Sequence, residues 1–225
     1  MSARPITIAP SLLSCDFARL GEELRRVEES GGDWHHVDVM DGHFVPNLTI
    51  GPPVVAKIHA AAQLPLDVHL MITDPRQYAQ AFADAGAHVL TFHAETAGST
   101  QEALDTIQVF RDVGVERVGV ALNPDYAIET VAEYLDRVDL VLVMSVHGGF
   151  GGQRFIPEVL SKVEWLRARG YAGFVEMDGG LNRDTVGRCA AAGADVLVAG
   201  SAVFGADDMP TTIAELRSRA EEARA

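Results

Sequence analysis

Short apolar runs and longer segments of helical periodicity alternate from one end of this 225-residue chain to the other. The apolar runs end at glycine, proline or small polar residues, as strands do, and the segments between them repeat apolar residues at helical spacing. Strands are predicted over 6–13, 34–41, 65–72, 88–95, 117–122, 139–146, 173–178 and 196–199. Helices are predicted over 18–30, 52–62, 75–85, 99–113, 127–137, 157–169, 184–192 and 212–223.

This alternation predicts a (β/α)8 TIM barrel, formed as a single catalytic domain by residues 1–225. Parallel strands need crossover helices, those helices cover the sheet, and the chain has an ordinary length for such a barrel. An open, doubly wound sheet is the competing architecture. It would need a glycine-rich nucleotide-binding turn after the first strand, and the segment Ser11-Leu12-Leu13-Ser14 contains no glycine.

The charge of the chain narrows the class of partner. A formal net charge of −14 disfavours nucleic acid, because binding to a phosphate backbone needs clustered lysine and arginine. A small anionic substrate stays compatible with this charge, since local backbone amides can bind an anion. The expected partner is therefore a small molecule.

Cysteine usage and hydropathy indicate the compartment. The only two cysteines, Cys15 and Cys189, form no Cys-x-x-Cys motif, so a reducing environment is the simplest interpretation. The first apolar run is too short for a signal peptide, and no run reaches the roughly 18 apolar residues of a membrane span. We expect a cytoplasmic protein without a membrane partner, and a homo-oligomer, because the outer helices carry alanine and leucine suited to subunit contacts.

The segment 36–42, His-Val-Asp-Val-Met-Asp-Gly, ends the second predicted strand. Side chains alternate along a strand, so His36, Asp38 and Met40 share one face, and Val37 and Val39 share the other. An isolated His-x-Asp pair on a strand is usually a buried hydrogen-bonded pair. Here, however, the pattern recurs at the ends of two other strands.

Those two strands carry Asp67-Val68-His69-Leu70-Met71 and Glu176-Met177-Asp178. The active face of a barrel lies at the carboxyl ends of its strands, where residues distant in sequence meet. His36, Asp38, His69 and Asp178 are therefore predicted to bind one divalent metal ion, which could be zinc, manganese, iron or cobalt. Asp67 and Glu176, two residues deeper, either orient these ligands or form a buried hydrogen bond or salt bridge.

Glycine clusters follow the last three strands. The loop at 148–152 has four glycines, and Gly179-Gly180 and Gly200-Ser201 follow the seventh and eighth strands. Backbone amides at these positions are predicted to bind phosphate, and the loop could also close over a substrate as a lid; a flexible surface turn is the alternative for the loop alone.

Other side chains at the strand ends are less distinctive. Ser11 is either a donor to a sugar hydroxyl or a structural hydroxyl in a turn. Met40, Met71 and Met144 are either ordinary core or an apolar collar around an intermediate. His93, Asn123 and His147 also face the predicted mouth without an assigned role.

Taken together, these motifs resemble the ribulose-phosphate 3-epimerase family over essentially the whole chain. The resemblance is carried by 9–13 (APSLL), 36–42 (HVDVMDG), 44–47 (FVPN), 67–71 (DVHLM), 144–146 (MSV), 149–153 (GFGGQ), 178–180 (DGG) and 198–201 (VAGS). It implies a metal-dependent isomerase that interconverts D-ribulose 5-phosphate and D-xylulose 5-phosphate in the pentose phosphate pathway.

The resemblance also implies roles for individual residues. The metal ligands fall on His36, Asp38, His69 and Asp178, and the acid/base pair falls on Asp38 and Asp178. Two carboxylates can invert C3 through a cis-enediolate, one removing a proton from one face and the other returning a proton to the opposite face. The substrate and phosphate contacts fall on Ser11, His69, Gly149, Phe150, Gly151, Gly152, Gly179, Gly180, Gly200 and Ser201.

One position departs from the family pattern. The family usually has proline before the Gly-Phe-Gly-Gly run, and this chain has Gly148, which adds backbone freedom just before the predicted lid. A 3-epimerase of a hexulose 6-phosphate such as D-allulose 6-phosphate therefore stays open as the alternative function. A decarboxylase of the orotidine-monophosphate type is disfavoured, because it needs a lysine at the position of Met40.

Overall fold

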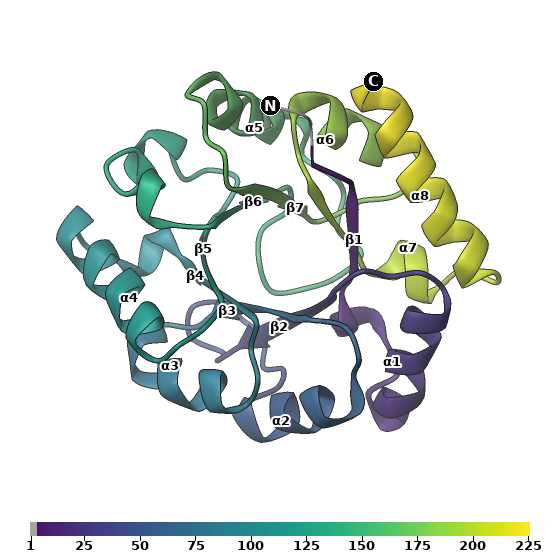
Figure 1. The fold of residues 1–225 in the computed structure, drawn as a ribbon, viewed down its shortest axis with the longest axis horizontal. Helices are drawn as coiled ribbons and strands as arrows, with labels where there is room; N and C mark the ends of the chain where they lie inside the picture. The colour runs from purple at the N-terminus through teal and green to yellow at the C-terminus, as the bar shows by residue number, and fades with distance from the viewer. Residues whose placement is uncertain (1–3) are drawn as a thin grey trace.

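The structure is a computed structural model that describes residues 4–225, and it confirms the predicted TIM barrel (Figure 1). Eight parallel strands form one sheet in the order β1-β8-β7-β6-β5-β4-β3-β2. Their bounds are β1 Thr7–Pro10, β2 His35–Met40, β3 Leu66–Met71, β4 Val89–His93, β5 Arg117–Leu122, β6 Leu140–Met144, β7 Phe174–Asp178 and β8 Val196–Ala199.

Helices surround the strands and form the outer layer (Figure 1). The α-helices are α1 Leu20–Glu29, α2 Pro52–Ala61, α3 Pro75–Asp84, α4 Thr100–Asp112, α5 Leu160–Ala168, α6 Val186–Ala192, α7 Ser201–Phe204 and α8 Met209–Arg224. Short 3-10 turns are η1 Leu12–Ser14, η2 Phe17–Arg19, η3 Ala94–Thr96, η4 Ile128–Val131, η5 Leu135–Arg137 and η6 Pro157–Val159. Within the described residues, no helix is both long enough and apolar enough to cross a membrane.

The barrel closes at a narrow seam between β1 and β2. Every other neighbouring pair of strands forms a continuous ladder, whereas these two share the single parallel bridge between Ser11 and His36. Asp33, just before β2, supports the seam: its amide donates to the Ile8 carbonyl at 2.9 Å, and its carboxylate accepts from the Ile8 amide at 2.7 Å. The seam therefore lies directly beside the first predicted metal ligand.

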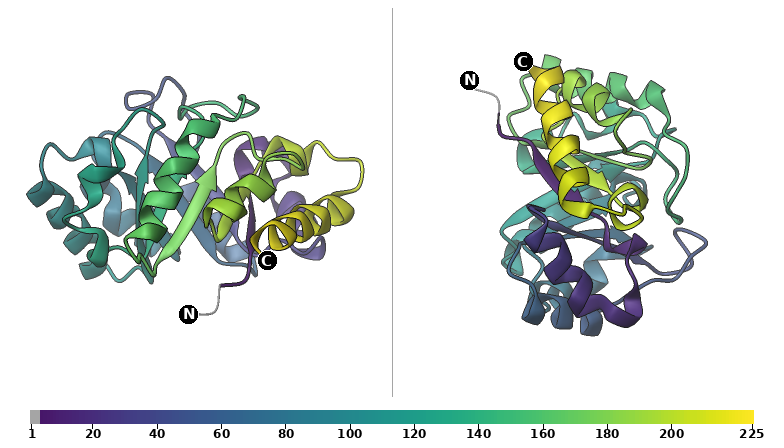
Figure 2. Two further views of the ribbon diagram at one scale, coloured as in Figure 1. Left: turned by 90° about the horizontal axis from the view of Figure 1, so that it is seen from above. Right: turned by 90° about the vertical axis from the view of Figure 1, so that its right-hand side faces the viewer.

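The predicted alternation of side chains is present on β2. Val37 and Val39 belong to the large apolar layer between the sheet and the helices. His36 and Asp38 lie on the opposite, inner face and are buried. The start of β1 and the C-terminal end of α8 lie on the face where the strands begin (Figure 2), so the opposite face, with the carboxyl ends of the strands, is free for a site.

Helix boundaries follow ordinary capping chemistry. Asp74 accepts a hydrogen bond from the Gln77 amide and precedes Pro75 at the first position of α3. Asp208 does the same for the Thr211 amide at the start of α8. Gly193, with φ at 116°, ends α6 in the left-handed region that favours glycine.

The predicted helix at 127–137 is wrong. This segment forms the two 3-10 turns η4 and η5. Its start is rich in β-branched residues, and the Thr130 hydroxyl donates to the Ala127 carbonyl at 2.7 Å, which competes with helical pairing. The four-residue helix α7, which begins at Ser201, was not predicted.

Lys162 holds the loop between β5 and η4. Its ammonium donates to the carbonyls of Asn123, Pro124 and Tyr126 at 2.8, 2.8 and 2.6 Å, and the side chain is buried. We expect Lys162→Met to lower the free energy of unfolding by about 2 to 4 kcal/mol, because the half-buried carbonyls of Pro124 and Tyr126 lose their charged donor. Urea unfolding measures this change. The same substitution at the exposed Lys57 of α2 is the control, and an equal effect there would contradict the assignment.

Candidate active site

Four side chains converge at the carboxyl ends of β2, β3 and β7. One nitrogen or oxygen atom from each of His36, Asp38, His69 and Asp178 lies within 4.8 Å of the others. Asp38 is central, since its Oδ1 is 3.4 Å from His36 Nε2 and 3.4 Å from His69 Nδ1. The structure thus brings together all four residues that the sequence pattern selected as metal ligands.

The donor atoms of this cluster fit a divalent cation. His36 Nε2 and His69 Nδ1 are buried and have no hydrogen-bond partner among residues 4–225. The other nitrogen of each ring is engaged: His36 Nδ1 lies 2.6 Å from Asp67 Oδ2, and His69 Nε2 lies 2.9 Å from His93 Nε2. Two imidazoles held in this way, together with two carboxylates, form a nitrogen and oxygen set that transition metals accept.

The interior below the cluster supports His36. Asp67 Oδ2 is its hydrogen-bond partner, and Glu176 Oε1 lies 3.2 Å from the same ring nitrogen. Burial and the neighbouring Asp67 carboxylate raise the pKa of Glu176 well above its usual range. A protonated Glu176 avoids a second buried negative charge beside Asp67, whose Oδ2 is the hydrogen-bond partner of His36 Nδ1.

The surroundings shift the pKa values of Asp38 and Asp178 in opposite directions. Burial disfavours the ionised form of Asp38, but the neighbouring His36 outweighs burial and lowers the pKa of Asp38 far below the usual range. The Ser11 hydroxyl also donates to Asp38 Oδ2 at 2.6 Å. Burial, followed by the charge of Asp38, raises the pKa of Asp178 to about 7. One carboxylate is therefore held ionised, and the other retains a proton near neutral pH.

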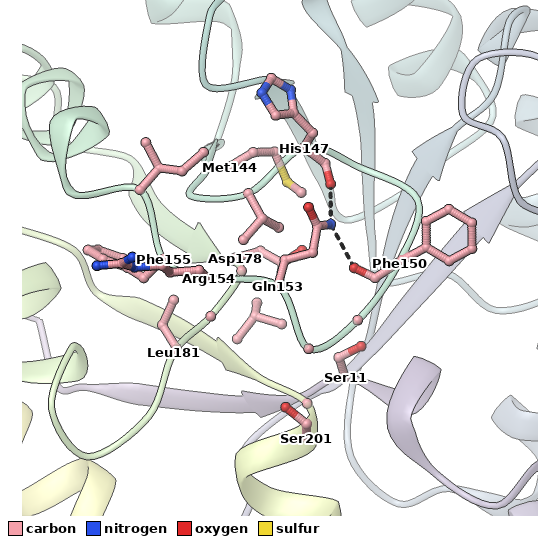
Figure 3. A pocket seen from close by; sticks show the side chains of 18 of the residues that line it. Ser11, Met144, His147, Phe150, Gln153, Arg154, Phe155, Asp178, Leu181 and Ser201 are labelled. Atoms are coloured by element: carbon pink, nitrogen blue, oxygen red, sulfur yellow. Dashed lines mark hydrogen bonds between the residues drawn. The ribbon is translucent and has the colours of Figure 1, made fainter.

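A cavity of about 1120 Å³ opens above the cluster at the barrel mouth (Figure 3). Asp38 and Asp178 lie in its wall, and His36 and His69 are buried beside it. The remaining predicted contacts also line the cavity: Ser11, Met40, Met71, Met144, Gly149, Phe150, Gly151, Gly152, Gly179, Gly180, Gly200 and Ser201. Their individual roles stay predictions.

Side chains hold the loop at 147–153 over the cavity. The Gln153 amide donates to the carbonyls of His147 at 2.6 Å and Phe150 at 2.8 Å (Figure 3). Asn47, on the loop after β2, donates to the Gly149 carbonyl at 2.7 Å. The Phe150 side chain is 55% exposed and its ring points away from Asp178 (Figure 3). The loop thus carries a large apolar side chain that is mostly exposed.

The glycines after β7 and β8 are required by close packing. A Cβ at Gly179, where φ is 116°, would lie 2.4 Å from Val146 Cγ2, and one at Gly180 would lie 2.7 Å from the Phe155 amide nitrogen. A Cβ at Gly200 would lie 2.5 Å from Ser14 Oγ. These three positions therefore keep bare backbone at the wall of the cavity, as the prediction of amide contacts requires.

Several residues of the site were missed from the sequence. Asn47 and Gln153 lie in loops and act on the backbone, which periodicity does not reveal. Glu95 follows β4 and contacts His93, a residue that the sequence left unassigned. The signal for Glu95 was its spacing of two from a histidine at a strand end, the same spacing as in His36-x-Asp38.

Fold and site together define a TIM-barrel enzyme with a metal-type centre of two histidines and two aspartates at its mouth. Comparison with known proteins specifies this class further. The profile of the ribulose-phosphate 3-epimerase family matches residues 7–204. The chain belongs to this family of isomerases.

Two proteins named ribulose-phosphate 3-epimerase are similar in sequence to this chain over nearly its whole length. A ribulose-phosphate 3-epimerase of Mycobacterium tuberculosis is 50% identical over 217 residues, covering 95% of this chain and 92% of that protein. One of Bacillus subtilis is 48% identical over 217 residues, covering 94% of this chain and 98% of that protein.

Solved structures with low sequence identity share the fold. KGPDC from Streptococcus mutans is similar at a TM-score of 0.74 and 14% identity, covering 99% of this chain and 100% of that one. The 3-hexulose-6-phosphate synthase from Salmonella typhimurium is similar at a TM-score of 0.69 and 18% identity, covering 97% of this chain and 100% of that one.

Proposed function

We propose that this enzyme interconverts D-ribulose 5-phosphate and D-xylulose 5-phosphate by inverting the configuration at C3. The observation that carries the proposal is the pair Asp38 and Asp178, which come from β2 and β7 and meet at one cluster with two imidazole nitrogens that have no hydrogen-bond partner among the described residues. The relatives at about half identity are named for this reaction. The hexulose 6-phosphate alternative has no observation in its favour.

Proton transfer is assigned to the two carboxylates. Asp38, whose Oδ2 accepts from the Ser11 hydroxyl, removes the C3 proton, and Asp178, whose pKa is raised, delivers a proton to the opposite face. In the reverse reaction the roles are exchanged. Both residues are fixed at strand ends, so the proton donor and acceptor keep their places while the carbon between them changes configuration.

His36, Asp38, His69 and Asp178 would hold one divalent cation, and zinc, manganese, iron and cobalt all accept two imidazoles and two carboxylates. Such an ion would supply Lewis-acid stabilisation of the negative charge that proton removal creates. Asp67 would keep the His36 ring in place through its hydrogen bond to Nδ1.

The rest of the cavity wall would bind the substrate. Backbone amides of the 149–152 loop and of Gly179, Gly180, Gly200 and Ser201 are proposed to take the phosphate, and Ser11 is proposed to contact a sugar hydroxyl. Met40, Met71 and Met144 would form an apolar collar around the reacting carbons.

We further propose a single catalytic domain that works in the cytoplasm as a homo-oligomer. Cys15 and Cys189 are both free thiols, in keeping with a reducing compartment. Sedimentation velocity on the purified chain tests the oligomeric state.

Solvent-deuterium exchange tests the function. Enzyme loaded with a divalent metal is expected to introduce deuterium at C3 of D-ribulose 5-phosphate and to form labelled xylulose 5-phosphate, both followed by NMR. The chelated enzyme is expected to lose most of this exchange, because the charge left on C3 and the carbonyl is then unopposed. Absence of exchange by the loaded enzyme would refute the pentulose phosphate assignment, and the same assay with D-allulose 6-phosphate tests the alternative.

A further inference from the structure

A line of hydrogen bonds leaves the metal-type cluster through His69 and ends at a carboxylate outside it. His69 Nε2 lies 2.9 Å from His93 Nε2, and His93 Nδ1 lies 3.2 Å from Glu95 Oε2. Both imidazoles are completely buried, so water does not take the place of either ring. The mechanism described above uses neither His93 nor Glu95.

The chemistry of these groups fixes where the protons are. A carboxylate can only accept, so the Nδ1 atom of His93 carries the proton that faces Glu95. A neutral His93 then has a bare Nε2, which accepts from His69 Nε2–H across the 2.9 Å contact. A neutral His69 with its proton on Nε2 has a bare Nδ1, and this atom makes no hydrogen bond within the described residues, since its 3.4 Å contact with Asp38 Oδ1 is not one.

We propose that Glu95 is a positioning residue that acts through His93 to set the tautomer of His69, so that His69 Nδ1 presents a lone pair to a divalent cation. Glu95 does not touch the cluster itself. For its effect on turnover this inference rests on the proposed function, but its effect on metal binding stands on the geometry alone.

The second oxygen of Glu95 also accepts a hydrogen bond, which fixes the direction of donation along the line from His69 through His93 to Glu95. Glu95 Oε1 accepts from the Asn123 amide at 2.7 Å. Asn123 is fixed in turn, since its carbonyl accepts from Lys162 at 2.8 Å. Both carboxylate oxygens therefore face donors, and the site accepts a residue with two acceptors and no donor.

Glu95→Gln reverses the direction of hydrogen-bond donation along this line, and the shape of the side chain hardly changes. The glutamine oxygen must face the Asn123 amide, so its NH2 group faces His93 Nδ1, which then has to accept. His93 Nε2 becomes the protonated nitrogen and donates to His69 Nε2, and the remaining His69 proton moves to Nδ1. That proton points at the position where the cation would bind.

The experiment measures tautomers and metal affinity in the full-length protein. In wild-type enzyme freed of metal with chelator, 15N NMR is expected to show a protonated Nε2 and a bare Nδ1 for His69; in Glu95→Gln the two are exchanged. Cobalt(II) titration, followed by its visible spectrum, is expected to show an affinity about 10- to 100-fold weaker in the variant. Glu102→Gln, at an exposed position of α4, removes the same charge and should leave both readouts unchanged.

A double-mutant cycle separates the relay from the loss of charge near the cation. In a His93→Phe background no polar atom connects residue 95 with His69, so Glu95→Gln should then have little further effect on cobalt affinity. An equal loss in both backgrounds would mean that Glu95 acts only through its charge. If 15N NMR of the wild-type enzyme showed the His69 proton on Nδ1, the inference would be refuted. This test needs no variant, so it holds even if Glu95→Gln folds poorly.

The outcome is independent of the proposed reaction. If wild-type enzyme binds cobalt with the expected tautomer but does not exchange deuterium at C3, the proposed function fails and the role of Glu95 stands. If the enzyme exchanges deuterium but Glu95→Gln binds cobalt as wild type does, the proposed function stands and the role of Glu95 fails.

Discussion

Asp178→Asn is expected to lower kcat for epimerisation by about 1000-fold or more. General acid–base catalysis by one positioned group contributes about 100- to 10,000-fold, and an amide neither gives nor takes the C3 proton. Asparagine keeps the size of the side chain and one oxygen toward the cluster, so substrate binding should change much less than kcat. Steady-state kinetics gives kcat, and calorimetry with D-ribulose 5-phosphate gives the affinity.

A matched substitution controls for the loss of a carboxylate elsewhere. Asp84→Asn, at an exposed position on α3, should leave kcat at the wild-type level. If Asp178→Asn retained kcat within a small factor of wild type, Asp178 could not be the proton donor, and the assignment of the acid/base pair would have to be abandoned.

Asp38→Asn is expected to abolish both turnover and tight metal binding. Asp38 Oδ1 lies 3.4 Å from both His36 Nε2 and His69 Nδ1, and Asp38 Oδ2 accepts from Ser11. The Asp38 carboxylate is therefore at the centre of the cluster. Losing this charge should weaken cobalt affinity by more than the roughly 10- to 100-fold that changes to orienting groups cost. Metal titration and deuterium exchange on the same preparation measure the two losses.

Asp178→Asn and Asp38→Asn are expected to differ in metal binding. Asp178→Asn should retain substrate binding while losing turnover, and Asp38→Asn should lose the metal as well. An Asp38→Asn enzyme that still bound cobalt tightly would show that the cation is held elsewhere.

The barrel and its cluster could be predicted because they depend on local alternation. On β2 the valines face the helices, and His36 and Asp38 face inward, as a period of two requires. The carboxyl ends of parallel strands meet at one face, so strand position alone was enough to gather ligands that are separated by about 140 residues of sequence, from His36 to Asp178.

What failed depends on contacts that periodicity does not encode. The pattern of 127–137 is that of a helix, but tertiary hydrogen bonds from Lys162 fix the preceding loop, and β-branched residues favour 3-10 turns. His93 could be placed at the mouth but not given a role, because its role depends on which nitrogen faces His69 and which faces Glu95. Such directions are properties of side-chain geometry, which a sequence pattern leaves open.

The seam between β1 and β2 has a consequence for the synthesis of the protein. The ladder of β1 is formed with β8, whose residues 196–199 follow all the other strands in the sequence, so β1 gains its ladder only after those strands have been synthesised. Only then does Ser11 reach His36 at the bridge and donate to Asp38. A nascent chain that stops before β8 therefore lacks both the closing strand and the serine contact to its catalytic carboxylate, and completion of the barrel wall coincides with completion of the site.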